Sequence, residues 1–373
     1  MHYGSGCRSM EVRLLVCLVA ISLVLFLPRV APAQEAEGGA VMVSGTVEVE
    51  AGTYKRSYDD ALKPDDKAND IVLATVEVGV DAQINPSVSG HVLFLWEEGE
   101  SEDINDFMDE GTITISNPDK CPYYLTAGKM YLPFGSFDSA FVSDPMTLEL
   151  GEINDSAIQI GHRKGNTDIS FGFFNGDLNK VDKDDKVNSF FANVGVEYTQ
   201  GPYSTVFGVS YISNIADTDG LEGIVDDQDL ATGDIIDIND FVDGMGLFLK
   251  INTDAWFLSA EYVAAMDDFA MGYFTDSTGN NSTVKTLQPA AYNVEFGWQT
   301  MGKALLALKY EQADDMEIDD DFDLPESRYG VCLSYTLYDD VDLKLEYLHE
   351  KFDNADLNKG KSDMFTAQLA VGF

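Results

Sequence analysis

The chain ends in "DMFTAQLAVGF" (Asp363–Phe373), and this stretch carries the pattern that decides the fold. Every odd position from Phe365 to Phe373 is apolar, whereas the even positions are mostly small or polar. Alternation with a period of two places successive side chains on opposite faces of a β-strand. Because the pattern runs to the last residue without a polar tail, we expect a final strand that pairs with the first one, as in a closed barrel.

The same alternation recurs in about sixteen segments, each near the ten residues that a tilted membrane strand needs. In one of them, Val76 and Val78 flank Glu77, so one face is apolar and the other is charged. The predicted strands are 41–54, 71–83, 86–97, 109–116, 122–132, 156–163, 167–176, 189–200, 203–213, 241–252, 255–266, 288–299, 302–312, 326–338, 340–350 and 362–373.

The connections between these segments alternate in length. Tight turns such as Asn85-Pro86 alternate with long acidic stretches such as residues 216–240. Short turns on the periplasmic side and long loops on the outside are typical of an up-and-down barrel in an outer membrane. The sequence therefore predicts an all-β transmembrane antiparallel barrel, with a secreted β-sandwich as the structural alternative.

Residues 1–33 have the features of a signal peptide. Arg13 precedes an apolar run over 14–27, and Ala31-Pro32-Ala33 forms an A-x-A cleavage site. We expect cleavage after Ala33, export of the chain, and a barrel domain over residues 34–373. The mature chain would keep two cysteines, Cys121 and Cys332, too few for a disulfide framework, although a single bridge stays open.

Charge and composition narrow the function further. The chain has 23 Lys and Arg against 65 Asp and Glu, a net charge of −42, which argues against nucleic acid as a partner. Its 45% hydrophobic content argues against an acidic disordered chain. The acidic external loops would attract cations and could bind Ca²⁺ or Mg²⁺ weakly, but residues 217–229 lack the spacing of an EF-hand, so we expect no cofactor.

The third long connection, residues 133–155, differs from the others because it is rich in Phe, Met and Leu. We expect it to fold inward and narrow the pore; the alternative is a loop packed on the surface. The apolar residues predicted to pack on the barrel wall are Phe134, Phe137, Phe141, Met146, Leu148 and Leu150. The acidic residues predicted to face the lumen at this constriction are Asp138, Asp144, Glu149 and Glu152.

Charged residues on the polar strand faces are candidates for setting ion selectivity. The predicted basic residues of the lumen are Lys129, Arg163, Lys309, Arg328 and Lys344. The predicted acidic residues of the lumen are Glu48, Glu77, Glu197, Glu295, Glu311 and Glu346. Lys309, Arg328 and Lys344 come from three consecutive strands, and opposed to the loop acids they would set a field across the pore. For each residue, solvation of the lumen or pairing with a neighbour is the alternative.

The last strand also predicts how the barrel is assembled. Phe365, Leu369 and Val371 would face lipid, and Phe373 would lie at the periplasmic interface, where aromatic side chains are favoured. A terminal Phe on an alternating strand resembles the signal that the β-barrel assembly machinery reads. We therefore expect these four residues to act as an assembly signal.

The stretch "GKMYLPFGSFDSAFVSDPMTLELGE" (Gly128–Glu152) resembles the LbtU family of siderophore porins. The residues that carry the resemblance are Gly128, Lys129, Pro133, Phe134, Gly135, Asp144, Pro145, Thr147, Leu150, Gly151 and Glu152. The resemblance implies uptake of ferric siderophores across the outer membrane without a plug. The strand part is shared with phosphate-selective porins, for which a lysine-rich lumen would be expected instead of this acidic one.

Together these features predict a passive, non-enzymatic porin in outer-membrane lipid that conducts small hydrophilic solutes and prefers cations to chloride. Ferric siderophores are the solute that the resemblance implies, and a general cation-preferring porin is the nearest alternative. A surface adhesin or receptor and a barrel enzyme are the alternatives from other classes, although no G-x-S-x-G motif occurs. A homotrimer is a candidate assembly, with no interface signature in the sequence.

Overall fold

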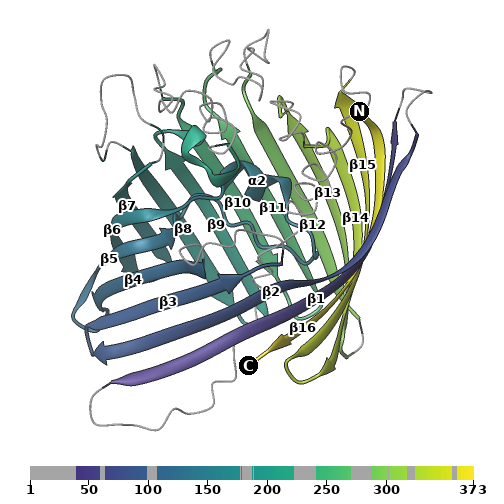
Figure 1. Ribbon diagram of the computed structural model, residues 1–373. Coiled ribbons are helices and arrows are strands. Elements are labelled where there is room, and N and C mark those ends of the chain that lie inside the picture. The colour runs from purple at the N-terminus through teal and green to yellow at the C-terminus, as the bar shows by residue number, and fades with distance from the viewer. Residues whose placement is uncertain are drawn as a thin grey trace, which may run out of the picture.

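A closed antiparallel barrel is the whole architecture of the computed structural model (Figure 1). Within the residues that the structure describes, sixteen strands pair with their neighbours in chain order, and β16 closes on β1. The described residues are 39–58, 64–98, 107–176, 178, 187, 189–221, 241–269, 287–300, 302–316, 324–354 and 359–373. The predicted fold class is confirmed.

The strand bounds follow the predicted segments closely. The first eight strands are β1 (Ala40–Tyr58), β2 (Asp66–Asn85), β3 (Val88–Trp96), β4 (Met108–Asn117), β5 (Cys121–Tyr131), β6 (Asn154–Lys164), β7 (Thr167–Phe174) and β8 (Ser189–Gln200). The second eight are β9 (Tyr203–Ile212), β10 (Gly244–Asn252), β11 (Trp256–Ala265), β12 (Ala290–Gln299), β13 (Ala304–Asp314), β14 (Ser327–Tyr338), β15 (Val341–Asn354) and β16 (Lys359–Gly372). In the described part of the chain, the short helices α2 (Met146–Gly151) and η2 (Ile215–Asp217) lie in loops.

The closing seam pairs the two ends of the barrel. Val47 lies opposite Val371 and Ala51 lies opposite Ala367 in the β1–β16 ladder. This pairing satisfies the backbone groups that an edge strand would leave exposed. It confirms that the final strand pairs with the first.

The two faces of each strand have different surroundings, as the alternation predicts. On β16, Phe365 and Leu369 are 45% and 43% exposed on the outer surface, whereas Gln368 between them is 1% exposed and points inward. Apolar side chains on the outside and polar ones inside suit a barrel surrounded by lipid.

Two strands, β1 and β2, exceed their predicted lengths the most. β1 and β2 have 19 and 20 residues, and their extracellular ends remain paired, with Lys55 opposite Lys67. These ends are polar on both faces, so the alternation that marks a strand is missing there. At the opposite end of the barrel, tight turns use Gly165 and Gly201 with φ of 60° and 59°, a conformation that glycine adopts without strain.

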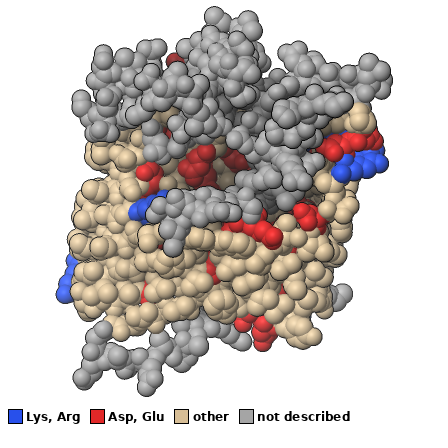
Figure 2. Space-filling model, viewed as in Figure 1, with Lys and Arg blue, Asp and Glu red and all other residues tan. Residues whose placement is uncertain are grey.

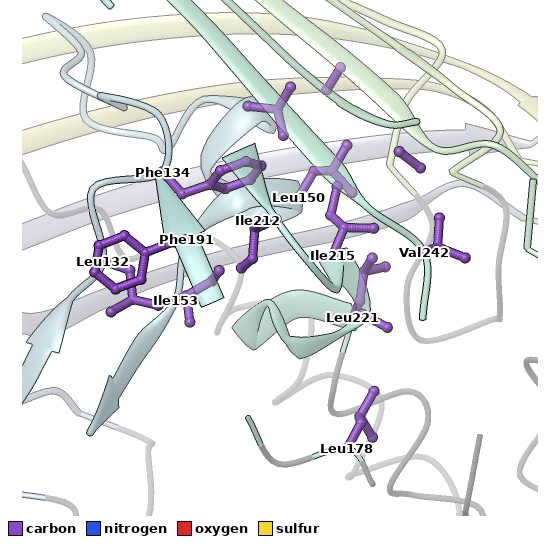
Figure 3. Close-up of a cluster of buried hydrophobic side chains, with 14 of the residues drawn as sticks. Leu132, Phe134, Leu150, Ile153, Leu178, Phe191, Ile212, Ile215, Leu221 and Val242 are labelled. Atoms are coloured by element: carbon purple, nitrogen blue, oxygen red, sulfur yellow. The ribbon is translucent and has the colours of Figure 1, made fainter. Parts of the chain in front are cut away.

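An apolar cluster fills part of the barrel interior (Figure 3). Leu132, Phe134, Leu150 and Ile153 contribute from the third loop, and Ile215 and Leu221 come from the segment after β9. They pack on inward side chains of the wall such as Phe191 and Ile212. The barrel therefore has a packed core on one side instead of an empty lumen throughout.

No helix in the described part of the chain is long and apolar enough to cross a membrane.

Two sequence predictions concern the ends of the chain and its cysteines. The predicted signal peptide lies outside the described residues. Cys121 is exposed, Cys332 is buried, and both are free, so the single bridge that the sequence left open is not formed.

Candidate functional site

The third loop lies inside the barrel. Its two ends meet where the Leu132 amide donates to the Ile153 carbonyl at 2.9 Å. Between them, Phe134, Phe141, Met146 and Leu150 are at most 1% exposed. The predicted inward folding is confirmed, because these apolar side chains leave water by packing on the wall.

Carboxylates on the wall hold the backbone of the loop. Glu261 on β11 accepts hydrogen bonds from the amides of Ser136 and Phe137, at 2.6 and 3.0 Å. Glu295 on β12 accepts from the Ala140 amide at 2.9 Å. A backbone amide bonded to an ionised carboxylate makes a stronger hydrogen bond than a neutral pair does.

Two further glutamates of the wall accept hydrogen bonds from the loop backbone in the same way. Glu346 on β15 accepts from the amides of Val142 and Ser143, at 2.7 and 3.0 Å, and from the Ser143 hydroxyl at 2.6 Å. Glu311 on β13 accepts from the Met146 amide at 2.8 Å. Four wall glutamates therefore anchor the loop: Glu261, Glu295, Glu311 and Glu346. We call them the anchor glutamates.

The predicted basic ladder binds the same loop through its carbonyls. Lys309 donates to the carbonyl of Ser143 at 3.2 Å, and Arg328 donates to that of Asp144 at 2.9 Å. Lys344 donates to the carbonyl of Phe141 at 3.3 Å. The ladder exists, as predicted, but it lies under the loop.

Pairing within the wall neutralises most of these charges. Lys309 lies 3.4 Å from Glu295, and Arg328 lies 3.3 Å from Glu311 and 2.9 Å from Glu350. The prediction that the ladder faces the loop acids across the pore is therefore wrong. The physical reason is that the buried backbone of the loop needs donors and acceptors, and the wall charges supply them.

The acids of the loop itself lie in varied surroundings. Asp138 forms an ion pair with Lys250 of β10. Asp144 is buried, whereas Glu149 and Glu152 are half-buried. Burial and the nearby carboxylates raise the pKa of Asp144 and of Glu152 well above the ordinary range. Burial raises the pKa of Glu149 to about 7, against the opposing effect of Arg328.

The wall of β1 and β2, which β16 joins to β15, carries acids that make no hydrogen bond with the described residues of the loop. Of these acids, Glu48 and Glu50 are 5% and 7% exposed. Glu48 and Glu77 line a cavity of about 840 Å³ that also reaches Lys250. Gln368 donates to Glu48 at 3.1 Å and to Glu50 at 2.9 Å. Among the described residues, no ion pair involves Glu48, Glu50 or Glu77. We call these three residues the open-wall acids, and Figure 2 shows acidic side chains inside the hollow of the barrel.

Three predicted lumen residues lie away from the loop. Lys129 is exposed and shares the outward parity of Tyr123 and Leu125, so its assignment to the lumen is wrong. Arg163 is on the inward face, but at the periplasmic end of β6, where it bonds Asp168 at 2.6 Å. Arg163 therefore lies on the lumen side, as predicted, at the end of β6 that is away from the third loop. Glu197 lies on the inward face near the periplasmic end of β8.

The C-terminal residues lie where the sequence predicts. Phe365, Leu369 and Val371 are on the outer face, and Phe373 is 66% exposed at the periplasmic end. The ring of Phe373 covers Gly45 of β1, since a Cβ there would lie 2.5 Å from the ring. Their role as an assembly signal stays a prediction.

Deleting Phe373 should sharply lower the yield of folded barrel, measured by the mobility shift on boiling before electrophoresis; an unchanged yield would contradict the role.

The structure brings two further residues to the site, Glu261 and Lys250. Both lie on inward-facing strand positions, one strand or two before Glu295. Strand parity in the sequence already places both on the polar faces, although neither is among the predicted selectivity residues. In the predicted cation-binding loop, Asp217 accepts from the Ser189 hydroxyl at 2.8 Å, and residues 222–240 lie outside the described parts. No group of three metal-ligating side chains occurs among the described residues.

A sixteen-stranded barrel with a loop folded into its lumen is the architecture of an outer-membrane porin. The profile of the Gram-negative porin family matches residues 19–355. The chain therefore belongs to the Gram-negative porin family, and its barrel is an outer-membrane barrel.

Similar proteins occur in Coxiella burnetii and Legionella pneumophila. A UPF0422 protein of Coxiella burnetii is 26% identical over 302 residues, which cover 79% of this chain and 62% of the relative. Its counterpart lpg2959 of Legionella pneumophila is 24% identical over 352 residues, 85% of this chain and 64% of the relative. The chain thus spans less than two thirds of the length of these relatives.

Solved structures with low sequence identity share the fold. The channel DcaP of Acinetobacter baumannii has a TM-score of 0.58 at 14% identity, covering 91% of this chain and 99% of that one. An anion-selective porin of Comamonas acidovorans has a TM-score of 0.58 at 12% identity, covering 90% of this chain and 100% of that one. At this level of identity the likeness concerns the fold alone.

Proposed function

We propose that this porin is a passive channel for small hydrophilic solutes with a preference for cations. The observation that carries the proposal is the asymmetric lumen. The loop is bonded to the wall of β11–β15, where charges are paired, and its described residues make no hydrogen bond or ion pair with the open-wall acids. Solutes would pass between the loop and these acids. Charges along a narrow passage attract ions of the opposite sign and exclude those of the same sign.

Among the loop acids, Glu149, whose pKa is about 7, would add to this preference when it is ionised. Glu149 and Glu152 lie close enough to Asp144 to raise its pKa, and Glu149 also raises that of Glu152. A concentration of carboxylates with few free cations produces a negative potential that draws cations in. Salt screens such a potential, so the preference should shrink as the salt concentration rises.

The test is the reversal potential of the purified protein in planar bilayers under a KCl gradient. Wild type should prefer K⁺, and the triple amide variant Asp144→Asn/Glu149→Gln/Glu152→Gln should show a weaker preference. The mobility shift on boiling must be unchanged in the variant, which shows that the barrel is folded. Anion preference in the wild type would contradict the proposal.

Uptake of ferric siderophores is a finer proposal, supported only by the resemblance over Gly128–Glu152. Its test is uptake of a ⁵⁵Fe-labelled siderophore into cells whose other outer-membrane routes for it have been deleted. Uptake should depend on this protein and should not require the energy-coupling system that plugged transporters use. Steady channel currents without such uptake would support the general channel and reject the siderophore.

A homotrimer is the assembly that we propose, because a Vibrio cholerae outer-membrane protein with the same fold is described in a trimer form (TM-score 0.51, 14% identity). Native mass spectrometry from detergent would measure the assembly directly. A single-chain mass under conditions that preserve trimers of other porins would contradict it.

A further inference from the structure

A row of lysines crosses the outer surface of the barrel seam. Lys351, Lys361, Lys55 and Lys67 come from β15, β16, β1 and β2, which are adjacent strands. Each has the parity of an outward-facing residue on its strand. Lys361 follows the alternation of Phe365 and Leu369, and Lys351 that of Tyr347. We call these four residues the lysine row.

The strand register brings like charges directly opposite one another. Lys351 is the partner of Lys361 in the β15–β16 ladder, and Lys55 is the partner of Lys67 in the β1–β2 ladder. Side chains at directly opposed positions are neighbours, and like charges there destabilise the sheet. Two such pairs on four adjacent strands are unexpected in a chain whose net charge is −42.

Acidic neighbours neutralise the row only in part. Lys55 pairs with Asp65 at 3.1 Å, and Lys351 pairs with Glu326 at 2.6 Å. The side chains of Lys67 and Lys361 form no ion pair with any described residue.

One more carboxylate lies within the row, and its neighbours already hold it. Asp363 is the partner of Lys55 in the β1–β16 ladder. Its carboxylate accepts from the Tyr347 hydroxyl at 2.7 Å and lies 2.8 Å from Nδ1 of His349. The lysine row therefore has a net positive charge that is available to bind an anion from outside the protein.

The position of the row relative to the membrane indicates the source of that anion. β1 ends at Tyr58 and β16 begins at Lys359, so the row lies at the extracellular end of the seam. Lys361 lies four residues beyond Phe365, which is about 13 Å along a strand. Outward aromatic side chains mark the interface on neighbouring strands, where Tyr310 and Tyr329 have ring centroids 4.9 Å apart. In the strand register, Lys351 and Lys361 lie two residues beyond the row of these tyrosines, and Lys55 and Lys67 lie in that row. The lysines thus lie at the extracellular aromatic belt and just beyond it, at the depth of lipid headgroups.

We propose that the lysine row binds the phosphate groups of outer-leaflet lipid. Lysine is a compact point charge that binds phosphate well, and its long stem reaches along an apolar surface to the headgroups. A phosphate between the paired lysines would remove the repulsion that the register creates. Figure 2 shows basic side chains on the upper right edge of the barrel, where β1 reaches its extracellular end in Figure 1.

The test measures lipid binding to the folded full-length barrel in detergent by native mass spectrometry. The probes are diphosphoryl lipid A, the same lipid without phosphates, and inorganic phosphate as a competitor. Wild type should bind the phosphorylated lipid, and the double variant Lys67→Gln/Lys361→Gln should bind it about 25-fold more weakly, since each basic residue near an anionic surface contributes about fivefold. Lys129→Gln is the matched control, because Lys129 faces outward at the same end of the barrel without a neighbouring lysine.

Four outcomes would overturn the proposal. The first is equal binding of the two lipids, and the second is wild-type affinity in the double variant. The third is an equal loss of affinity in Lys129→Gln. The fourth is complete displacement of the lipid by millimolar inorganic phosphate, which would show that the row takes free phosphate instead of lipid. The mobility shift on boiling confirms that each variant is folded.

Discussion

The two walls of the lumen use the same residue types for different purposes. On the β11–β15 wall, Glu311 and Glu346 are at most 1% exposed and accept hydrogen bonds from the loop. On the β1–β2 wall, Glu48 and Glu77 face a cavity and pair with no cation among the described residues. The two groups of glutamates differ in whether the buried backbone of the third loop lies against the carboxylate. An inward glutamate therefore fixes the loop on one wall and sets the field in the passage on the other.

Removing the loop should have the largest effect, because the loop is what separates the walls into two classes. Deletion of residues 137–150 should raise single-channel conductance severalfold, since the passage then spans the full lumen. It also uncovers the basic ladder, so the preference for cations should fall. Planar-bilayer recording measures both quantities. Unchanged conductance would place the loop outside the passage.

Equivalent substitutions on the two walls should differ strongly in stability. Glu346→Ala leaves the buried amides of Val142 and Ser143 and the Ser143 hydroxyl without their acceptor, so it should lower the free energy of unfolding by about 3 kcal/mol. Glu77→Ala removes no hydrogen bond recorded in the structure and should change it by less than about 0.5 kcal/mol. Urea titration in detergent gives both values. Equal changes for the two variants would remove the distinction between the walls.

Selectivity should respond in the opposite order. Glu48→Gln/Glu77→Gln should lower the ratio of cation to anion permeability by about two- to fivefold, because two unpaired charges leave the passage. Its conductance at high salt should stay close to that of the wild type. Glu295→Gln is the matched control, since Glu295 is paired with Lys309 and fully buried. A larger loss of selectivity in the control would contradict the assignment.

A weaker effect should appear on changing pH. The pKa of Glu149 is about 7, so its carboxylate gains a proton as the pH falls from 8 to 6, and cation preference should decline over that range. The raised pKa also means that folding favours the protonated form. This group's contribution to stability is therefore greatest at low pH and is lost as the pH rises from about 4.5 to about 7. Glu149→Gln should flatten the selectivity change measured by reversal potential; an unaltered profile would assign the titration to another group.

The sequence predicts the barrel well because its signal is local. Alternation with a period of two identifies each strand, and the predicted 189–200 coincides with β8. The sequence did not predict the extracellular ends of β1 and β2. Both faces of these strands are polar there, so apolar and polar residues do not alternate. The inward loop was predictable as well, since its apolar side chains need a surface to pack on.

The sequence could not predict which wall binds the loop and which lines the passage. Strand parity gives the face on which a residue lies but not its position around the barrel. Lys309 and Glu48 have the same inward parity, yet one lies under the loop and the other faces the cavity. Which wall the loop covers depends on contacts between residues more than a hundred positions apart, such as Ser136 with Glu261. No local pattern encodes such a contact.

The most direct test of the two-wall account uses a thiol buried under the loop. Cys332 is 1% exposed and packs with Phe141 of the loop, so it should resist a cationic methanethiosulfonate reagent in the folded channel. Cys121→Ser should therefore carry an unchanged current when the reagent is added, whereas Glu77→Cys in that background should lose current and cation preference together. Rapid modification of Cys332 in the folded channel, or no response from Glu77→Cys, would contradict the account.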